Sequence, residues 1–121
     1  MKKLYIGWED IGIMVDFLVD KIKKSRIKYD GIYGIPRGGL PLAVTLSHHL
    51  NLPLLVHPTI NSLVCDDISD TGVTLANIKH KKIVCLFKSK WTKTKPDYYY
   101  AEKEDKKSWL VFPWEDYKNE N

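Results

Sequence analysis

An apolar run that ends in a cluster of carboxylates constrains this chain more than any other feature of its sequence. The run begins at Ser62 and ends in the neighbouring acids Asp66 and Asp67, and the residues 70–74 follow as Asp-Thr-Gly-Val-Thr. The apolar residues that come directly after this loop have helical spacing. A buried strand, a polar loop and a helix in this order place the loop at the carboxyl end of a strand, where open α/β sheets bind their ligands.

The loop 70–74 suits a phosphate group. Gly72 lets the backbone approach an anion closely, and Thr71 and Thr74 add hydroxyl donors to the free amides at a helix start. The two carboxylates beside the loop suit a sugar diol, which donates hydrogen bonds to them, or a Mg²⁺ ion. This combination predicts a site for a phosphorylated ribose. The alternative is an Asp-rich turn with a helix cap, since Asp and Thr favour such positions.

A second strand–loop–helix unit lies upstream. The residues 29–35 read as a strand, 36–39 as a glycine loop and 40–50 as a helix. The backbone of this loop can approach an anion closely because the loop contains two glycines. The guanidinium of its arginine can donate hydrogen bonds to two phosphate oxygens at once. These residues are Arg37, Gly38 and Gly39. The two loops predict one cleft that both Arg37 and Thr74 line.

The remaining pattern completes an α/β protein. We expect a single domain over residues 1–121, with a mainly parallel central sheet flanked by helices. Beyond the two units, the residues 102–107 read as an exposed loop, and Trp8 is expected to pack in the core. Further expected elements are helices over about 8–24 and 73–79 and strands over 52–57 and 82–87.

Composition excludes several classes of protein. The 121 residues are 44% hydrophobic and 28% charged, with a net charge of +4, which is ordinary for a globular domain. No apolar run reaches membrane-spanning length, so we expect a cytoplasmic protein with no membrane partner. Cys65 and Cys85 lie inside apolar runs, which favours buried free thiols over a disulfide. The lysines are mostly scattered, so we expect an anionic small ligand and no nucleic acid, although the basic loop 88–95 with Trp91 keeps nucleic-acid binding as an alternative.

The residues 66–74 resemble the ribose-phosphate motif of the type I phosphoribosyltransferases: an acidic pair, two residues, then Asp-Thr-Gly-x-Thr. The resemblance implies that phosphoribosyl pyrophosphate binds, with Mg²⁺ as cofactor at Asp66 and Asp67. It implies that Asp70 is catalytic and takes the proton of the base. It implies a pyrophosphate loop at 36–39 with a cis peptide between Pro36 and Arg37. The implied donor-binding residues are Asp66, Asp67, Asp70, Thr71, Gly72, Val73 and Thr74, and those for pyrophosphate are Arg37, Gly38 and Gly39.

The C-terminal third resembles the purine branch of that family, which acts on hypoxanthine, guanine and xanthine. The resemblance rests on a lysine after a strand, on Lys-Pro-Asp-Tyr-Tyr at 95–99, and on Trp-Leu-Val-Phe-Pro-Trp-Glu at 109–115. It implies that Lys88, or else Lys90, meets the purine oxygen and that Trp109 stacks on the base. The implied function is transfer of ribose 5-phosphate to a purine in nucleotide salvage, with pyrophosphate released. Because the family tends to dimerise, the resemblance leaves a homodimer open.

The sequence departs from the family at one place. The family usually has a long flexible hood loop before the ribose-phosphate strand, whereas only the residues 58–61 separate the two strands here. We therefore expect an open donor site, with the basic loop 90–95 as a substitute cover. A protein of the same fold that binds phosphoribosyl pyrophosphate or a nucleotide without turnover is the alternative, since poor exclusion of water impairs the chemistry.

Overall fold

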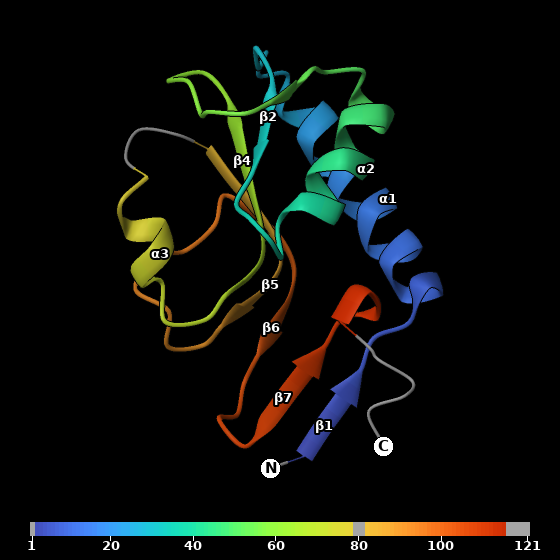
Figure 1. Cartoon of the computed structure of the whole chain (residues 1–121), viewed down its shortest axis with the longest axis vertical. Coiled ribbons are helices and arrows are strands. Elements are labelled where there is room, and N and C mark those ends of the chain that lie inside the picture. The colour runs from blue at the N-terminus through green and yellow to red at the C-terminus, as the bar shows by residue number, and fades with distance from the viewer. Residues whose placement is uncertain (1, 79–81, 116–121) are drawn as a thin grey trace.

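Five parallel strands form the central sheet of the computed structural model, which describes residues 2–78 and 82–115. The order across the sheet is β3–β2–β4–β5–β6 (Figure 1). The bounds are Ile32–Gly34 for β2, Leu54–Leu55 for β3, Leu63–Ser69 for β4, Lys82–Ser89 for β5 and Tyr98–Lys103 for β6. Gly34 pairs with Cys65, and Cys65 pairs with Val84. The structure thus confirms the expected parallel α/β sheet.

Helices cover both faces of this sheet. The helices α1 (Trp8–Ser25) and α2 (Leu40–Leu50) lie on one face, and the short α3 (Val73–Ala76) lies on the other (Figure 1). At the start of α1, the Asp10 carboxylate accepts the Gly7 amide at 2.8 Å, which satisfies a donor that has no partner inside the helix. The positions of α1 and α2 agree with those expected from apolar spacing.

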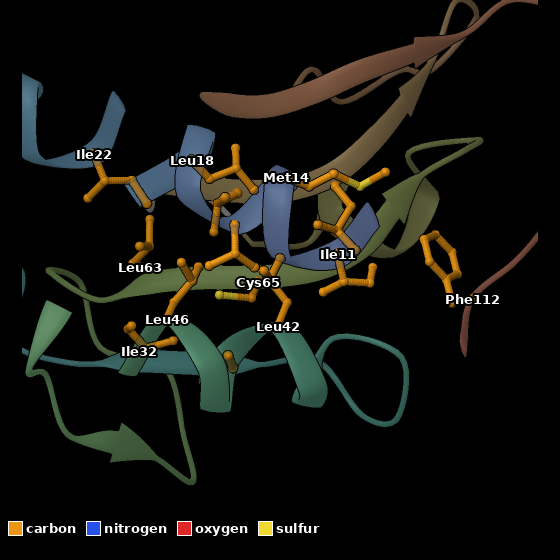
Figure 2. Packing of buried hydrophobic residues seen from close by; sticks show 14 residues of the cluster. Ile11, Met14, Leu18, Ile22, Ile32, Leu42, Leu46, Leu63, Cys65 and Phe112 are labelled. Carbon is orange, nitrogen blue, oxygen red and sulfur yellow. The ribbon is translucent and has the colours of Figure 1, made fainter. Parts of the chain in front are cut away.

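The main core lies between the two long helices and the sheet (Figure 2). Apolar residues at helical spacing on α1 meet α2 and the central strands there. Fully burying one such aliphatic side chain contributes roughly 1.5–3 kcal/mol to folding. The principal members are Ile11, Met14, Leu18, Ile32, Leu42, Leu46, Leu63, Cys65 and Phe112. Cys65 and Cys85 are buried free thiols, as expected, and burial raises the pKa of both.

A second, two-stranded sheet joins the two ends of the chain. The parallel strands are β1 (Lys2–Tyr5) and β7 (Ser108–Val111), followed by the 3₁₀ turn η1 (Pro113–Glu115). This sheet lies on the side where β2 and β4 end (Figure 1). The expected loop at 102–107 is partly wrong, because β6 continues through Lys103 beside β5. Within the described residues, no helix combines the length and apolar character needed to cross a membrane.

Candidate active site

The two loops singled out in the sequence lie at one edge of the sheet. Residues 36–39 follow β2 and residues 70–72 follow β4, and these neighbouring strands are parallel. The peptide between Pro36 and Arg37 is cis, as the resemblance implied. The Ile35 amide donates to the Cys65 carbonyl at 2.9 Å, which ties the first loop to β4. A Cβ on Gly39 would collide with that same Cys65 carbonyl oxygen, so only glycine fits there.

The larger cavity at this edge measures about 880 Å³ and contains the first loop. Arg37, Gly38 and Asp67 line one part of it, and Trp8 and Trp114 line another. Their indole rings lie 5.9 Å apart. The expectation that Trp8 packs in the core is wrong, since 63% of its surface is exposed. It is the first residue of α1, where a side chain lies beyond the packed part of the helix.

A smaller hollow of about 110 Å³ belongs to the second loop. It is lined by Asp66, Ile68, Ser69, Asp70, Thr71, Gly72, Thr74 and Leu75. The expected single cleft is therefore two neighbouring hollows, with Arg37 in the larger and Thr74 in the smaller. Residues of β4, which continues to Ser69, line both hollows. Asp66 lines the smaller hollow and Asp67 the larger, and their carboxylates lie close enough to interact where the two hollows meet.

The carboxylates of Asp66 and Asp67 form an electrostatically unfavourable pair. The Asp67 amide donates to Oδ1 of Asp66 at 2.9 Å. Burial and then the negative charge of Asp67 raise the pKa of Asp66 to about 7. Within the described residues, neither carboxylate forms an ion pair with a lysine or arginine. A cation held with a phosphorylated ligand would relieve this repulsion, and Mg²⁺ commonly binds through one or two carboxylates plus substrate phosphates, so these residues fit that metal.

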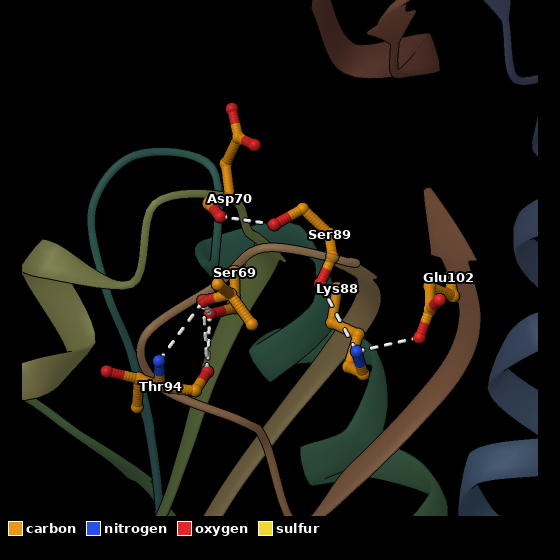
Figure 3. Close-up of polar contacts among 7 residues, drawn as sticks. Ser69, Asp70, Lys88, Ser89, Thr94 and Glu102 are labelled. Atoms are coloured by element: carbon orange, nitrogen blue, oxygen red, sulfur yellow. Dashed lines mark hydrogen bonds and ion pairs between the residues drawn. The ribbon is translucent and has the colours of Figure 1, made fainter. Parts of the chain in front are cut away.

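Asp70 begins the second loop and has an unused acceptor. Its Oδ1 is buried and has no hydrogen-bond partner among the described residues. The side chain points away from the hydrogen-bonded loop behind it, while its backbone carbonyl accepts the Ser89 hydroxyl (Figure 3). A buried acceptor without a partner is uncommon, and it fits a group that receives a proton only from a bound ligand.

Lys88 lies at the carboxyl end of β5 and is nearly buried. Its ammonium pairs with the Glu102 carboxylate at 2.7 Å and donates to the Ser89 carbonyl at 3.2 Å (Figure 3). This side chain therefore has two acceptors in the free protein. Lys90, the alternative, is exposed, and its amide donates to the Lys103 carbonyl at 2.9 Å. Trp109 lies on β7 beside Lys3, with 52% of its surface exposed.

The basic loop at 90–95 does not cover either hollow. Trp91 packs instead against two lysines, with the Lys103 and Lys106 nitrogens 5.5 and 5.1 Å from its ring centroid. Such contacts are favourable because the ring face is negative. The expected substitute cover is thus not in place in this structure. Sequence reasoning also missed a network of serine and threonine hydroxyls that joins the end of β4 and the loop 70–74 to residues 89–94, because single short hydroxyl residues give no pattern. These hydroxyls belong to Ser69, Ser89, Thr92 and Thr94.

Comparisons with known proteins agree with this geometry. No protein-family model matches the chain, and no curated protein matches it. Among solved structures, purine phosphoribosyltransferase from Pyrococcus horikoshii is 33% identical, with a TM-score of 0.82 and 97% of each chain covered. Xanthine-guanine-hypoxanthine phosphoribosyltransferase from Helicobacter pylori is 22% identical, with a TM-score of 0.80 and coverages of 93% of this chain and 94% of that one.

A hypothetical protein from Neisseria gonorrhoeae with bound ppGpp has the same fold, at 20% identity and a TM-score of 0.78. The alignment covers 97% of this chain and 91% of that one. The identity of one third to the Pyrococcus enzyme, over nearly the whole length of both chains, decides the family. This chain belongs to the purine phosphoribosyltransferases and is an enzyme of the phosphoribosyltransferase class.

Proposed function

We propose that this enzyme transfers ribose 5-phosphate from phosphoribosyl pyrophosphate to a purine base and releases pyrophosphate, as a step of nucleotide salvage. The observation that carries the proposal is the pair of glycine loops at one sheet edge, with Asp66 and Asp67 between their two hollows. The donor has a phosphate at one end of its ribose and a pyrophosphate at the other. The loops 36–39 and 70–74 would bind these two anionic groups, and Asp66 and Asp67 lie between the loops, where the ribose diol would be.

The larger hollow suits the pyrophosphate end of the donor. Arg37 is exposed there and offers two parallel donors to phosphate oxygens. The Gly38 amide is a further donor, whereas the Gly39 amide already donates to the Ile35 carbonyl at 2.8 Å. We therefore assign Gly39 to close backbone packing. Asp67 lies directly against Gly38, so it would hold the metal-bound pyrophosphate or a ribose hydroxyl.

The smaller hollow suits the 5′-phosphate. Backbone and hydroxyl donors of Thr71, Gly72, Val73 and Thr74 would hold that group, and Asp66 would accept from the ribose diol. Mg²⁺, held at Asp66 and Asp67 with the donor, would neutralise charge on the departing pyrophosphate. Transfer breaks the bond from the ribose carbon to pyrophosphate and forms one to a base nitrogen. The charge on the leaving group is stabilised by Arg37 and the loop amide.

Asp70 would take the proton that the base nitrogen loses. Its unpaired Oδ1 leaves that acceptor free in the absence of a base, and a positioned general base contributes about 10²–10⁴ in rate. For the base itself, Lys88 would donate to the purine oxygen and Trp109 would provide a stacking face. Lys88 already pairs with Glu102, which would fix the direction of its remaining proton.

The test is a transfer assay with the purified protein, phosphoribosyl pyrophosphate and Mg²⁺. Hypoxanthine, guanine, xanthine and adenine are offered separately, and nucleotide and pyrophosphate are quantified. We expect equal amounts of both products with at least one 6-oxopurine. Tight binding of the donor without nucleotide from any base would instead favour a role in sensing the donor, and the transfer proposal would be wrong.

A further inference from the structure

We propose that the residues 89–94 form a brace behind the phosphate loop, and that Ser89 and Thr94 are positioning residues for the 5′-phosphate end of the donor. This rests on the proposed function, because it concerns how the loop 70–74 keeps its shape around that phosphate. From the sequence, the residues 90–95 were expected to cover the donor site. The brace gives this segment a different role, behind the phosphate loop.

The brace binds three successive backbone carbonyls of the phosphate loop. The Ser89 hydroxyl donates to the carbonyl of Asp70, and this contact is drawn in Figure 3. The other two donors are the Lys93 amide, to Thr71 O at 3.0 Å, and the Thr94 hydroxyl, to Gly72 O at 2.7 Å. All three carbonyls therefore point towards one segment, on one side of the loop.

The direction of the carbonyls decides the direction of the amides. In a trans peptide the C=O and the following N–H point in opposite directions. The amides of Thr71, Gly72 and Val73 therefore point away from the brace. Within the described part of the chain, those of Thr71 and Gly72 donate to no protein acceptor, and that of Val73 meets only the Thr71 hydroxyl, at 3.3 Å. Converging free amides of this kind make an anion site.

Burial and close packing make the brace rigid. Ser69 and Ser89 are buried at 1% and 0% exposure, so their hydroxyls need protein partners. Ser69 bonds to the Thr92 hydroxyl and to the Thr94 carbonyl, each at 2.7 Å. The contact with the phosphate loop is equally tight, because a Cβ on Gly72 would lie 2.5 Å from the Thr94 amide. The segment thus holds the loop from behind and is not free to close over the donor.

The test compares Thr94→Val, which removes only the hydroxyl donor, with Thr94→Ser, which keeps it. The control is Thr59→Val, the same change in a turn before β4, where the Thr59 hydroxyl bonds Asp30 at 2.7 Å. Calorimetry measures the Kd of ribose 5-phosphate and of pyrophosphate for each protein. We expect Thr94→Val to raise the Kd of ribose 5-phosphate about tenfold, the effect of one lost hydrogen bond. Pyrophosphate binding, Thr94→Ser and Thr59→Val should match the wild type.

A second readout does not depend on any ligand. The Ala76 amide donates to the same Gly72 carbonyl at 2.9 Å, so Thr94→Val should speed hydrogen exchange at Ala76 in the free protein. If Thr94→Val does not fold, Ser89→Ala takes its place, with the same ligands and the same expectation for ribose 5-phosphate.

Three results would overturn the brace. Wild-type affinity for ribose 5-phosphate in Thr94→Val, or in Ser89→Ala where that variant takes its place, would overturn it and leave the proposed function standing. An equal loss for ribose 5-phosphate and pyrophosphate would also overturn it, since the change would then act on the whole site. If the wild-type protein binds neither ligand, the proposed function itself fails, and the brace fails with it.

Discussion

Replacing Asp66 with asparagine should stabilise the free protein and impair its site. Asp66 is partly buried beside Asp67, and its pKa is raised from 3.8 to about 7. Between these two values the unfolded chain carries the negative charge while the folded chain keeps the proton. Stability therefore falls as pH rises through this window and stays low above pH 7.

The size of the effect follows from the shift. The difference between 7 and 3.8 is about 3.2 pH units, which at 1.36 kcal/mol per unit corresponds to about 4 kcal/mol above pH 7. At pH 5, which is about 1.2 pH units above 3.8, the loss of stability is smaller, at about 2 kcal/mol. The asparagine side chain has no charge to bury, and its oxygen can still accept the Asp67 amide that Asp66 accepts at 2.9 Å. Relaxation and water near the site reduce such energies, so we expect a gain of about 2–4 kcal/mol at pH 8.

Urea unfolding of the wild type and Asp66→Asn at pH 5 and pH 8 measures this gain. The control is Asp16→Asn, which removes the same charge from an exposed position on α1 that has no ion pair or hydrogen bond among the described residues. The gain should be larger at pH 8 than at pH 5, and the control should show little change at either. A gain at pH 8 no larger than that of Asp16→Asn would refute the account of Asp66. The stabilised variant should also bind the donor with Mg²⁺ more weakly, since the diol and the cation lose a carboxylate.

Three further outcomes follow from the site. Gly72→Ala should raise the KM of the donor at least about tenfold, since φ is +84° and the new Cβ would lie 2.5 Å from the Thr94 amide; an unchanged KM would contradict the tight packing. Trp109→Ala should raise the KM of the purine about tenfold and leave that of the donor unchanged, because Trp109 lines neither of the two hollows; an unchanged purine KM would exclude stacking. The enzyme should hydrolyse the donor slowly without a base, because the connection from β3 to β4 covers only residues 56–62; the absence of phosphate release in a pyrophosphate-coupled assay would argue for a closed site.

The sequence was sufficient for the fold and for the position of the two loops. Apolar spacing located α1 and α2, and buried strands followed by glycine loops located the carboxyl edge of the sheet. These features are local, since they depend on neighbouring residues along the chain. The cis peptide between Pro36 and Arg37 came from the resemblance alone, because no local pattern requires it there.

Features that depend on contacts between distant segments could not be predicted. The pairing of Lys88 with Glu102 needs the register of β5 and β6, and the cavity that Trp8 lines depends on η1, which places Trp114 beside it. Trp91 looked like a cover because its loop is basic, but two lysines hold its ring elsewhere. The larger hollow, where Asp67 lies, is lined by residues of α1, α2 and η1, which are distant from Asp67 in the sequence.

The central claim is that this site transfers ribose 5-phosphate to a purine with Asp70 as the general base. Its most direct measurement is the initial rate of purine nucleotide formation by the wild type and by Asp70→Asn, alongside the Kd of the donor for both. We expect measurable nucleotide formation by the wild type, and a loss of about 10²–10⁴ in kcat for the variant with the donor Kd unchanged. Transfer by Asp70→Asn at the wild-type rate would contradict the role of Asp70, and no nucleotide from any purine with the wild type would contradict the account as a whole.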